Sequence, residues 1–215
     1  MIEVFATVEA TQLYADLSGA APDWVLVDDR ALDSLSDSVS PAGVVAVCRF
    51  LDRPLDVIVG SAASLLAICA DVRDPGNAGT VIRTADAAGA GGVVLAGSSV
   101  DLHNPKTVRA SVGSVFHLPI AVAPDPAAAL RAAQDAGLVV LAADGAGEVD
   151  LYEADELLAR PAAWLFGNEA WGLPAELAAM ADHRVRIPIY GRAESLNLST
   201  AAAICLYASA RAQRQ

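Results

Sequence analysis

Residues 164–212 read WLFGNEAWGLPAELAAMADHRVRIPIYGRAESLNLSTAAAICLYASARA, and their order of apolar and polar segments decides the fold. One apolar run leads into the polar loop FGNEAWGLP, and a second leads into the polar loop IPIYGRAESLNLS. The second loop continues directly into an alanine-rich helix. This order of strand, loop and helix is typical of a parallel sheet covered by helices.

The same order recurs upstream, where the apolar run LLAICA is followed by the polar loop DVRDPGNAG and a helix. The apolar runs are nearly continuous, so the strands are expected to be buried on both faces, as parallel strands are. We therefore predict an α/β fold with a mostly parallel sheet and helices on both faces. The predicted strands are 65–70, 91–97, 118–123, 138–144, 162–166 and 183–189, and the predicted helices are 78–89, 104–116, 125–137, 174–181 and 198–213.

The first 50 residues carry a weaker pattern than the rest of the chain. Segments 9–19 and 31–39 are expected to form short helices, and DWVLVDD at 23–29 a strand. An apolar β-type run follows within 40–50. These elements are too few to close a core alone.

A change in composition near residue 50 marks the predicted domain boundary. The stretch RFLDRPLDVIVGSAAS contains a proline and several small residues, which predict a linker. We expect a partial N-terminal domain over 1–50, a linker over 51–62 and the main domain over 63–215.

The chain has 215 residues, of which 54% are hydrophobic, and a net charge of −12. The hydrophobic share suffices for a sizeable core, whereas the negative charge argues against a general nucleic-acid coat. A local basic patch is compatible with this charge, because several bases lie in or beside the polar loops. These bases are Arg83, Lys106, Arg109, Arg186 and Arg192.

No apolar run approaches the roughly 18–20 residues of a membrane span. The first residues, MIEVFATVEA, lack the basic and apolar regions of a signal peptide. We therefore expect a cytoplasmic protein with no membrane segment. The three cysteines, Cys48, Cys69 and Cys205, have apolar neighbours and are expected to be buried free thiols in a reducing compartment.

The first polar loop, at 71–79, has features of an anion site. Gly76 and Gly79 permit close backbone approach, Asn77 is a good helix N-cap, and the N–H groups at a helix start suit an anion. Arg83 lies one turn into the helix and could hold a phosphate as a fork. The spacing matches neither GxxxxGK[ST] nor GxGxxG, so triphosphate and classical dinucleotide sites are disfavoured. An ordinary helix cap with a surface arginine stays an open alternative.

The second and third polar loops also place hydrogen-bonding side chains after strands, where ligands bind in doubly wound sheets. Asn168 and Glu169 stand between glycines, and Ser195 and Asn197 flank Leu196. The alternatives are a glycine-rich turn with a capping acid for the second loop, and a loop with a helix cap at Ser199 for the third.

Two other kinds of site are disfavoured. The histidines His103, His117 and His183 are scattered, and no cysteine stands at ligand spacing, so we expect no metal site. No GxSxG surrounds Ser195, and no histidine is an obvious base for a hydrolase triad.

Three motifs carry a resemblance to a known family. NAGTVIRTADAAG, LFGNEAWGLP and RIPIYGRAESLNLSTAAAICLY resemble, in order and spacing, the motifs of the SpoU (TrmH-type) RNA 2′-O-ribose methyltransferases of the SPOUT superfamily. NPKTVRASVGSVFHLP also resembles that family's segment between its first and second motifs, and the match covers roughly 64–213. The resemblance implies S-adenosylmethionine as methyl donor, a C-terminal trefoil knot and a homodimer. Residues 22–50 resemble the tail of the L30e-like RNA-binding domain that often precedes this catalytic domain, and we expect the start of such a domain to be missing.

The resemblance also implies roles for individual residues. Ala170 departs from the family pattern, which usually has glycine there, and its added methyl is tolerated if its φ is negative. The reacting ribose is implied to meet Asn77, Arg83, Glu169, Ser195 and Asn197. The methyl donor is implied to meet Phe166, Gly167, Asn168, Ile187, Pro188 and Leu196.

The resemblance leads to one main functional interpretation and leaves alternatives. The main one is an S-adenosylmethionine-dependent RNA 2′-O-methyltransferase, with ribosomal RNA favoured over tRNA. A non-catalytic RNA-binding or ribosome-assembly protein with the same fold is the first alternative. A generic Rossmann-type cofactor enzyme is the second, weakened by the missing GxGxxG. We expect Arg83 to bind phosphate and stabilise the 2′-oxyanion rather than act as a base, since a guanidinium pKa exceeds about 12.

Overall fold

The computed structural model describes residues 1–36, 41–60 and 64–215. These residues form two compact units, Met1–Phe50 and Leu51–Gln215. The ends of the expected helix 31–39 and of the expected linker 51–62 lie outside the described residues.

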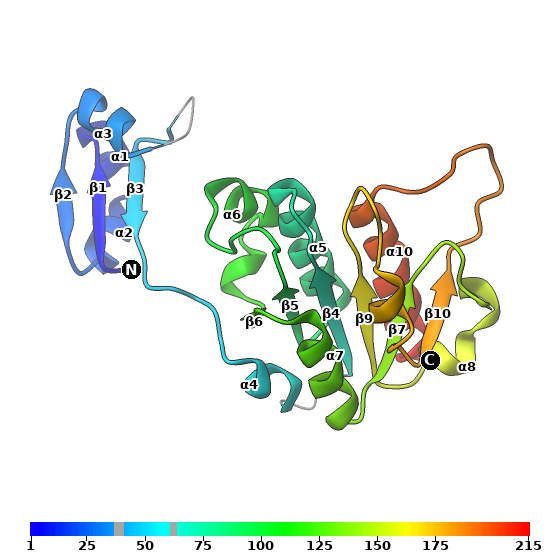
Figure 1. The fold of residues 1–215 in the computed structure, drawn as a ribbon. Coiled ribbons are helices and arrows are strands. Elements are labelled where there is room, and N and C mark those ends of the chain that lie inside the picture. Colours follow the sequence, from blue (N-terminus) through cyan, green and yellow to red (C-terminus); the bar gives the residue numbers. More distant parts are fainter. Residues whose placement is uncertain (37–40, 61–63) are drawn as a thin grey trace. The chain divides into compact units, whose positions relative to one another are not determined.

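The first unit is built on a three-stranded sheet in the order β2-β1-β3 (Figure 1). Strand β1 pairs with β2 in parallel and with β3 in antiparallel orientation. Its buried core is small and consists, among the described residues, of Val4, Ala6, Ala10 and Leu32. The elements are β1 (Glu3–Ala6), α1 (Val8–Leu13), α2 (Ala15–Ala20), β2 (Trp24–Leu26), α3 (Asp29–Leu35) and β3 (Val44–Val47).

Three expectations for this unit need correction. Strand β1 was not predicted, because four residues give too short an alternation to stand out. The expected helix 9–19 is two helices, because the backbone leaves the helical region at Tyr14 (φ −111°, ψ 43°). Cys48 is exposed rather than buried, because it follows the edge strand β3 of a sheet with a small core.

The second unit is a sheet of seven strands in the order β6-β5-β4-β9-β7-β10-β8, and every recorded pair is parallel. This confirms the predicted α/β class and its parallel sheet. The two-residue strand β8 was not predicted. The strands are β4 (Leu65–Ala70), β5 (Gly92–Ala96), β6 (Ile120–Ala123), β7 (Val139–Ala143), β8 (Val149–Asp150), β9 (Ala162–Phe166) and β10 (His183–Arg186).

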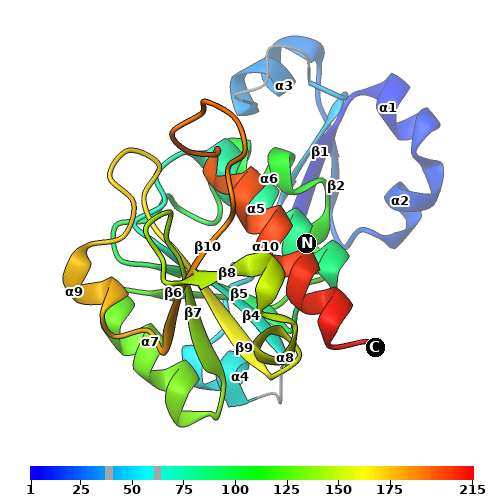
Figure 2. The same ribbon diagram turned by 90° about the vertical axis from the view of Figure 1, so that its right-hand side faces the viewer.

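Helices cover both faces of this sheet, as expected (Figure 2). Successive strand residues point to opposite faces, so Leu65 and Cys69 pack on the face of α5 and α10, whereas Leu66 and Ile68 pack on that of α4 and α7. The helices are α4 (Leu55–Gly60), α5 (Pro75–Ala88), α6 (Pro105–Ser111), α7 (Pro126–Asp135), α8 (Asp155–Leu158), α9 (Ala175–Ala178) and α10 (Leu198–Ala212), with 3₁₀ turns at η1 (Ser114–Phe116) and η2 (Leu151–Glu153).

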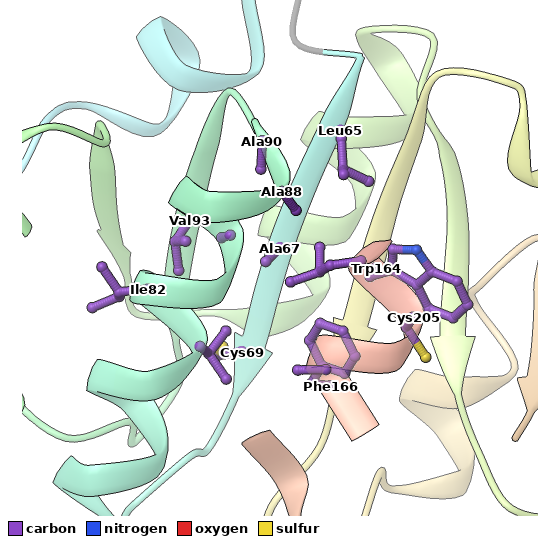
Figure 3. Close-up of a cluster of buried hydrophobic side chains, with 14 of the residues drawn as sticks. Leu65, Ala67, Cys69, Ile82, Ala88, Ala90, Val93, Trp164, Phe166 and Cys205 are labelled. Atoms are coloured by element: carbon purple, nitrogen blue, oxygen red, sulfur yellow. The ribbon is translucent and has the colours of Figure 1, made fainter. Parts of the chain in front are cut away.

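Trp164 on β9 anchors the last helix to the sheet. It is fully buried, its ring stacks with that of Phe166 at 6.2 Å between centroids, and its Nε1 donates a hydrogen bond to Ser209 Oγ on α10 (2.9 Å). Figure 3 shows Trp164 and Phe166 beside Cys205 of α10. Burial raises the pKa of both buried thiols, that of Cys69 to about 12, so these two cysteines are inert structural residues, as expected.

The segment predicted as a linker belongs to the second unit and carries α4. Ile58 is buried against the sheet, with Leu55 and Val59 packed beside it. The backbone N–H of Arg53 also donates to Ile120 O on the edge strand β6 (2.8 Å). The helical spacing of Leu55, Ile58 and Val59 was the missed signal, because the proline and small residues around it dominated the prediction.

Two helix boundaries differ from the prediction for local reasons. Helix α5 begins at Pro75, and Asp74 caps it by accepting from the N–H of Asn77 (2.8 Å), so Asn77 is not the N-cap. The expected helix 104–116 breaks after Ser111, because Val112 and Gly113 adopt φ of 50° and 93°.

Close contact between α5 and α6 depends on one glycine. A Cβ at Gly79 would lie 2.5 Å from Thr107 O and 2.6 Å from Ala110 Cβ. The first motif therefore uses Gly79 for helix packing. The threading of the chain end through a knot stays a prediction, because strand order and pairing do not establish it.

Candidate active site

The three predicted loops lie at the carboxyl ends of three strands of the same parallel sheet. The first follows β4, the second follows β9 beside it, and the third follows β10, which is separated from β9 by β7. Figure 1 shows the loop between β10 and α10 extending from this edge of the sheet. This is the edge at which parallel α/β sheets bind ligands.

The second loop is closed by its own backbone. Asn168 and Gly172 exchange two backbone hydrogen bonds (3.0 and 2.9 Å). A Cβ at Gly167 would lie 2.4 Å from the carbonyl carbon of Gly172, so only glycine fits there. Among the described non-glycine residues, φ is positive only at Asp71 and Val112, so Ala170 fits its position without strain of this kind.

Asn168 ties the second loop to the first. Its side chain is 5% exposed, and its Nδ2 donates to Asp71 O at the end of β4 (2.7 Å). Its Oδ1 accepts from the N–H of Ala170 (2.8 Å). Asp71 itself has a φ of 57°, and its carboxylate accepts from the N–H of Ser98 (2.7 Å), which holds this strained turn. The predicted donor-site residue Asn168 therefore also has a structural role.

Glu169 makes a second connection between these loops. Its carboxylate accepts from the N–H groups of Arg73 (3.2 Å) and Asp74 (3.0 Å) and from Asn77 Nδ2 (3.2 Å). Partial burial acts to raise the pKa of Glu169, but hydrogen bonds from its own N–H, from Asp74, Asn77 and Arg73 together lower that pKa below its ordinary value. Glu169 is therefore held as a carboxylate.

The third loop joins the same network through Asn197. Its Nδ2 donates to Asn77 Oδ1 (3.1 Å), and its Oδ1 accepts from the N–H groups of Ser199 and Thr200 at the start of α10. Asn197 is thus the N-cap of α10, a role the sequence suggested for Ser199. A chain of hydrogen bonds from Glu169 through Asn77 to Asn197 links all three loops.

A cavity of about 270 Å³ opens between the second and third loops. Seven predicted site residues line it, together with residues at the end of β7 and the start of α10. Those seven are Phe166, Gly167, Asn168, Glu169, Ile187, Ser195 and Leu196. The other four predicted residues, Asn77, Arg83, Pro188 and Asn197, are not among the lining residues.

Sequence reasoning missed the loop after β7 and part of the third loop. Ala143, Asp144 and Gly145 line the cavity, as do Ile189 and Glu194. The signal for the β7 loop was present, because an acid and a glycine directly follow that apolar strand, as GNE follows β9. In this wall Asp144 forms a 3.8 Å ion pair with Arg184 of β10.

Arg83 is exposed on α5, and its guanidinium makes no hydrogen bond or ion pair among the residues described. Its guanidinium is therefore available to an incoming anion. Arg186 is not available in this way, since it donates to Gly147 O (3.1 Å) and to Asp150 (3.3 Å). The expected basic patch thus loses Arg186, because that side chain holds β8 against β10.

The cavity has the character that a sulfonium-bearing methyl donor requires. Three carboxylates line it, those of Asp144, Glu169 and Glu194, and they favour a positively charged ligand. Apolar side chains of Ile187, Ile189 and Leu196 complete the wall, as in most small-molecule sites. The residues present therefore fit S-adenosylmethionine.

Comparison with known proteins identifies the family. Residues 64–207 match the model of the SpoU rRNA methylase family. The chain is 36% identical over 191 residues to a 23S rRNA uridine 2′-O-methyltransferase of Streptomyces viridochromogenes, covering 86% of this chain and 66% of that one. It is 34% identical over 201 residues to a 23S rRNA guanosine 2′-O-methyltransferase of Bacillus subtilis, covering 93% and 77%.

A solved structure agrees with these relatives. The rRNA methyltransferase of Sinorhizobium meliloti with bound S-adenosylmethionine superposes with a TM-score of 0.84 at 36% identity, covering 97% of this chain and 79% of that one. The chain belongs to the SpoU rRNA methylase family, and its two relatives named above are 23S rRNA 2′-O-methyltransferases. It spans about two thirds to four fifths of the length of these proteins.

Two further findings concern the described residues only. No helix in them is long and apolar enough to cross a membrane. No group of three or more histidine, cysteine or acidic side chains within these ranges is placed to hold a metal ion.

Proposed function

We propose that this protein transfers the methyl group of S-adenosylmethionine to a ribose 2′-hydroxyl of ribosomal RNA. Family membership and the two relatives named for 23S ribosomal RNA support this activity and favour ribosomal RNA over tRNA. Those relatives act on different nucleosides, so the target base is not inferred from them. The structural observation that carries the proposal is a pair of hydrogen bonds, from Asn77 to Glu169 and from Asn197 to Asn77. They join the three motif loops beside the cavity.

The donor is proposed to occupy the cavity between the second and third loops. S-adenosylmethionine supplies a methyl group bonded to a positively charged sulfur. The second loop, closed by the backbone hydrogen bonds between Asn168 and Gly172, gives one wall, and Ile187 and Leu196 give the other. Pro188 lacks an N–H and continues the chain beyond β10 without a further ladder bond.

The acceptor ribose is proposed to lie next to Asn77, Glu169, Ser195 and Asn197. Positioning of this kind can supply roughly 7–11 kcal/mol of a transfer barrier. Arg83 is proposed to hold a phosphate of the acceptor nucleotide and to stabilise negative charge as it develops on the 2′-oxygen. An arginine guanidinium is not deprotonated in proteins, so Arg83 is not the group that takes the proton of the 2′-hydroxyl.

Variants at Arg83 test this assignment. Arg83→Ala is expected to reduce kcat/KM for RNA by about 100-fold or more, with unchanged affinity for S-adenosylmethionine. Arg83→Lys keeps the charge but loses the fork, so it is expected to recover little of that loss. Retention of most turnover and RNA affinity in Arg83→Lys would show that the bidentate role is wrong. Arg131→Lys, on α7 across the sheet, is the matched control.

The activity itself is tested by two measurements on the purified protein. Calorimetry with S-adenosylmethionine is expected to show binding, and tritiated methyl transfer is expected with a 23S ribosomal RNA transcript but not with a tRNA transcript. Donor binding without transfer would support a non-catalytic RNA-binding or ribosome-assembly protein. Transfer to tRNA alone would reverse the preferred substrate.

Three properties of the whole protein belong to the same proposal. We propose a homodimer, because the resemblance implies one, and a cytoplasmic location, where ribosomal RNA is modified. Sedimentation at micromolar concentration is expected to show the dimer, and a clean monomer contradicts it.

The N-terminal unit, Met1–Phe50, is proposed to contact RNA as part of an L30e-like domain. Crosslinking of bound RNA with peptide mapping tests this, and crosslinks confined to Leu51–Gln215 contradict it.

A further inference from the structure

The chain contains three tryptophans, and one of them has no structural explanation in the fold. Trp24 donates its Nε1 hydrogen bond to Thr11 Oγ1 (2.9 Å), and Trp164 is fully buried and bonded to Ser209. Trp171 is 56% exposed, and its indole N–H has no hydrogen-bond partner among the described residues. An exposed, unbonded tryptophan is available to a ligand.

Trp171 lies beside the proposed active site. It stands between Ala170 and Gly172, both of which line the cavity, and it directly follows the Glu169–Ala170 turn. The guanidinium carbon of Arg73, from the first loop, lies 5.2 Å from the centre of its ring. The backbone N–H of Arg73 donates to Glu169, so the pair is attached to the network that joins the loops.

The contact between Arg73 and Trp171 is not needed to hold the first and second loops together. Glu169 and Asn168 already bind the second loop to the first with several hydrogen bonds, one of them partly buried and 2.7 Å long. An exposed cation–π contact contributes only about 0.5–1 kcal/mol. Arg73 is exposed and forms no ion pair in the part of the chain described, so its charge is also available.

We propose that Trp171, positioned by Arg73, is a stacking surface for an unpaired nucleobase of the RNA next to the ribose that is methylated. This inference rests on the proposed function. A ribose inside a duplex cannot reach a cavity between two loops, and RNA enzymes and binding proteins hold unstacked bases on aromatic and arginine surfaces. Arg73 also places a positive charge next to Trp171, in a protein whose net charge of −12 repels phosphates.

Steady-state kinetics on the full chain test the stacking role. Trp171→Ala is expected to raise KM for a 23S ribosomal RNA transcript roughly 5- to 150-fold, the range for loss of one base–aromatic stack. Trp171→Phe keeps a ring and is expected to stay within about threefold of the wild type. The affinity for S-adenosylmethionine is expected to be unchanged in both. Tyr152→Ala, which removes an equally exposed aromatic (56%) outside the cavity, is the matched control.

Fluorescence gives a readout that does not depend on turnover. A single-stranded oligoribonucleotide is expected to quench the tryptophan fluorescence of the wild type. Trp171→Phe still fluoresces through Trp24 and Trp164 but is expected to lose the quenching that stacking on Trp171 causes. An unchanged KM in Trp171→Ala, an equal loss in Trp171→Phe, or weaker donor binding would overturn the inference. If the wild type transfers no methyl group but Trp171 is still quenched, the proposed activity fails and the stacking surface stands. If the wild type shows neither methyl transfer nor quenching of Trp171, the proposed activity and the stacking surface are both wrong.

Discussion

The second and third loops line the same cavity but are held in different ways. From Gly167 to Gly172 the second loop is fixed by two backbone hydrogen bonds, by the buried Asn168 and by the carboxylate of Glu169. From Ile189 to Leu196 the third loop is exposed. Its side chains enter the network only at Asn197. One wall of the cavity is therefore built before a ligand arrives, whereas the other is fixed mainly at its end.

This difference suggests a division of work. A preformed wall can hold the donor in one geometry at little entropic cost, while a less constrained wall lets donor and RNA enter. Substitutions of the residues that fix the second loop, Gly167 and Asn168, should then damage both stability and donor binding. Substitutions in the third loop should leave stability nearly unchanged, except at Asn197.

The largest effect is expected from Gly167→Ala. The added methyl would lie 2.4 Å from the backbone of Gly172, so the loop must open, at a cost of about 3 kcal/mol of unfolding free energy and with loss of donor binding. Urea unfolding and calorimetry measure the two effects.

Gly191→Ala in the third loop is the matched control, because no atom lies within 4 Å of its added methyl. Its stability is expected to change by less than about 0.5 kcal/mol. Equal effects of the two substitutions would remove the contrast between the loops.

Asn168→Ala is expected to have the next largest effect. It leaves the carbonyl of Asp71 and the N–H of Ala170 without their partners, at a cost of about 1–3 kcal/mol. Thermal unfolding with and without S-adenosylmethionine measures the loss and shows whether ligand binding restores it. A neutral result would mean that water replaces the side chain and that the second loop is not prebuilt.

A double-mutant cycle between Asn77 and Asn197 tests the single attachment of the third loop. Their 3.1 Å hydrogen bond is exposed, so the coupling in unfolding free energy is expected to be about 0.5 kcal/mol. Asn197→Ala alone also removes a helix cap, which costs about 1 kcal/mol. Asn104 caps α6 in the same way and serves as the control. The effects of Asn104→Ala and Asn197→Ala on the unfolding free energy are expected to add. Additivity in the Asn77 cycle as well would contradict the network.

The smallest expected effect is a dependence on pH. The pKa of Glu169 is lowered on folding, so its contribution to stability is present above its ordinary value of 4.5 and is lost as the pH falls through the folded-state value. The difference in unfolding free energy between wild type and Glu169→Gln is therefore expected to shrink between pH 6 and the acid limit of folding. Glu176→Gln on α9 is the control, and a difference that is constant with pH would contradict the assignment.

The parallel sheet could be predicted from the sequence because the patterns that indicate it are local and repeated. Each main strand is a continuous apolar run, and the order of strand, loop and helix recurs at β4, β9 and β10. The two-residue strand β8 and the break at Val112 gave no comparable signal, since they depend on Arg186 and on two residues of positive φ.

Most residues of the candidate site could be predicted from the sequence, but the hydrogen bonds between them could not. Seven of the predicted residues line the cavity. That Asn77 bonds Glu169 and Asn197 across 92 and 120 positions of sequence is set by tertiary folding, which no local pattern contains. The choice of Asp74 over Asn77 as N-cap follows from Pro75, which starts the helix earlier, and it frees the Asn77 side chain for the network.

The most direct test of the account is the chemical position of the transferred methyl group. A 23S ribosomal RNA transcript would be incubated with the protein and S-adenosylmethionine, digested to nucleosides and analysed by mass spectrometry. We expect one methyl group on a ribose, absent in Asn77→Ala and present in Asn104→Ala, and an alkali-stable linkage at that nucleotide because its 2′-oxygen is blocked. A methyl group on a base, or none with any ribosomal RNA, would contradict it.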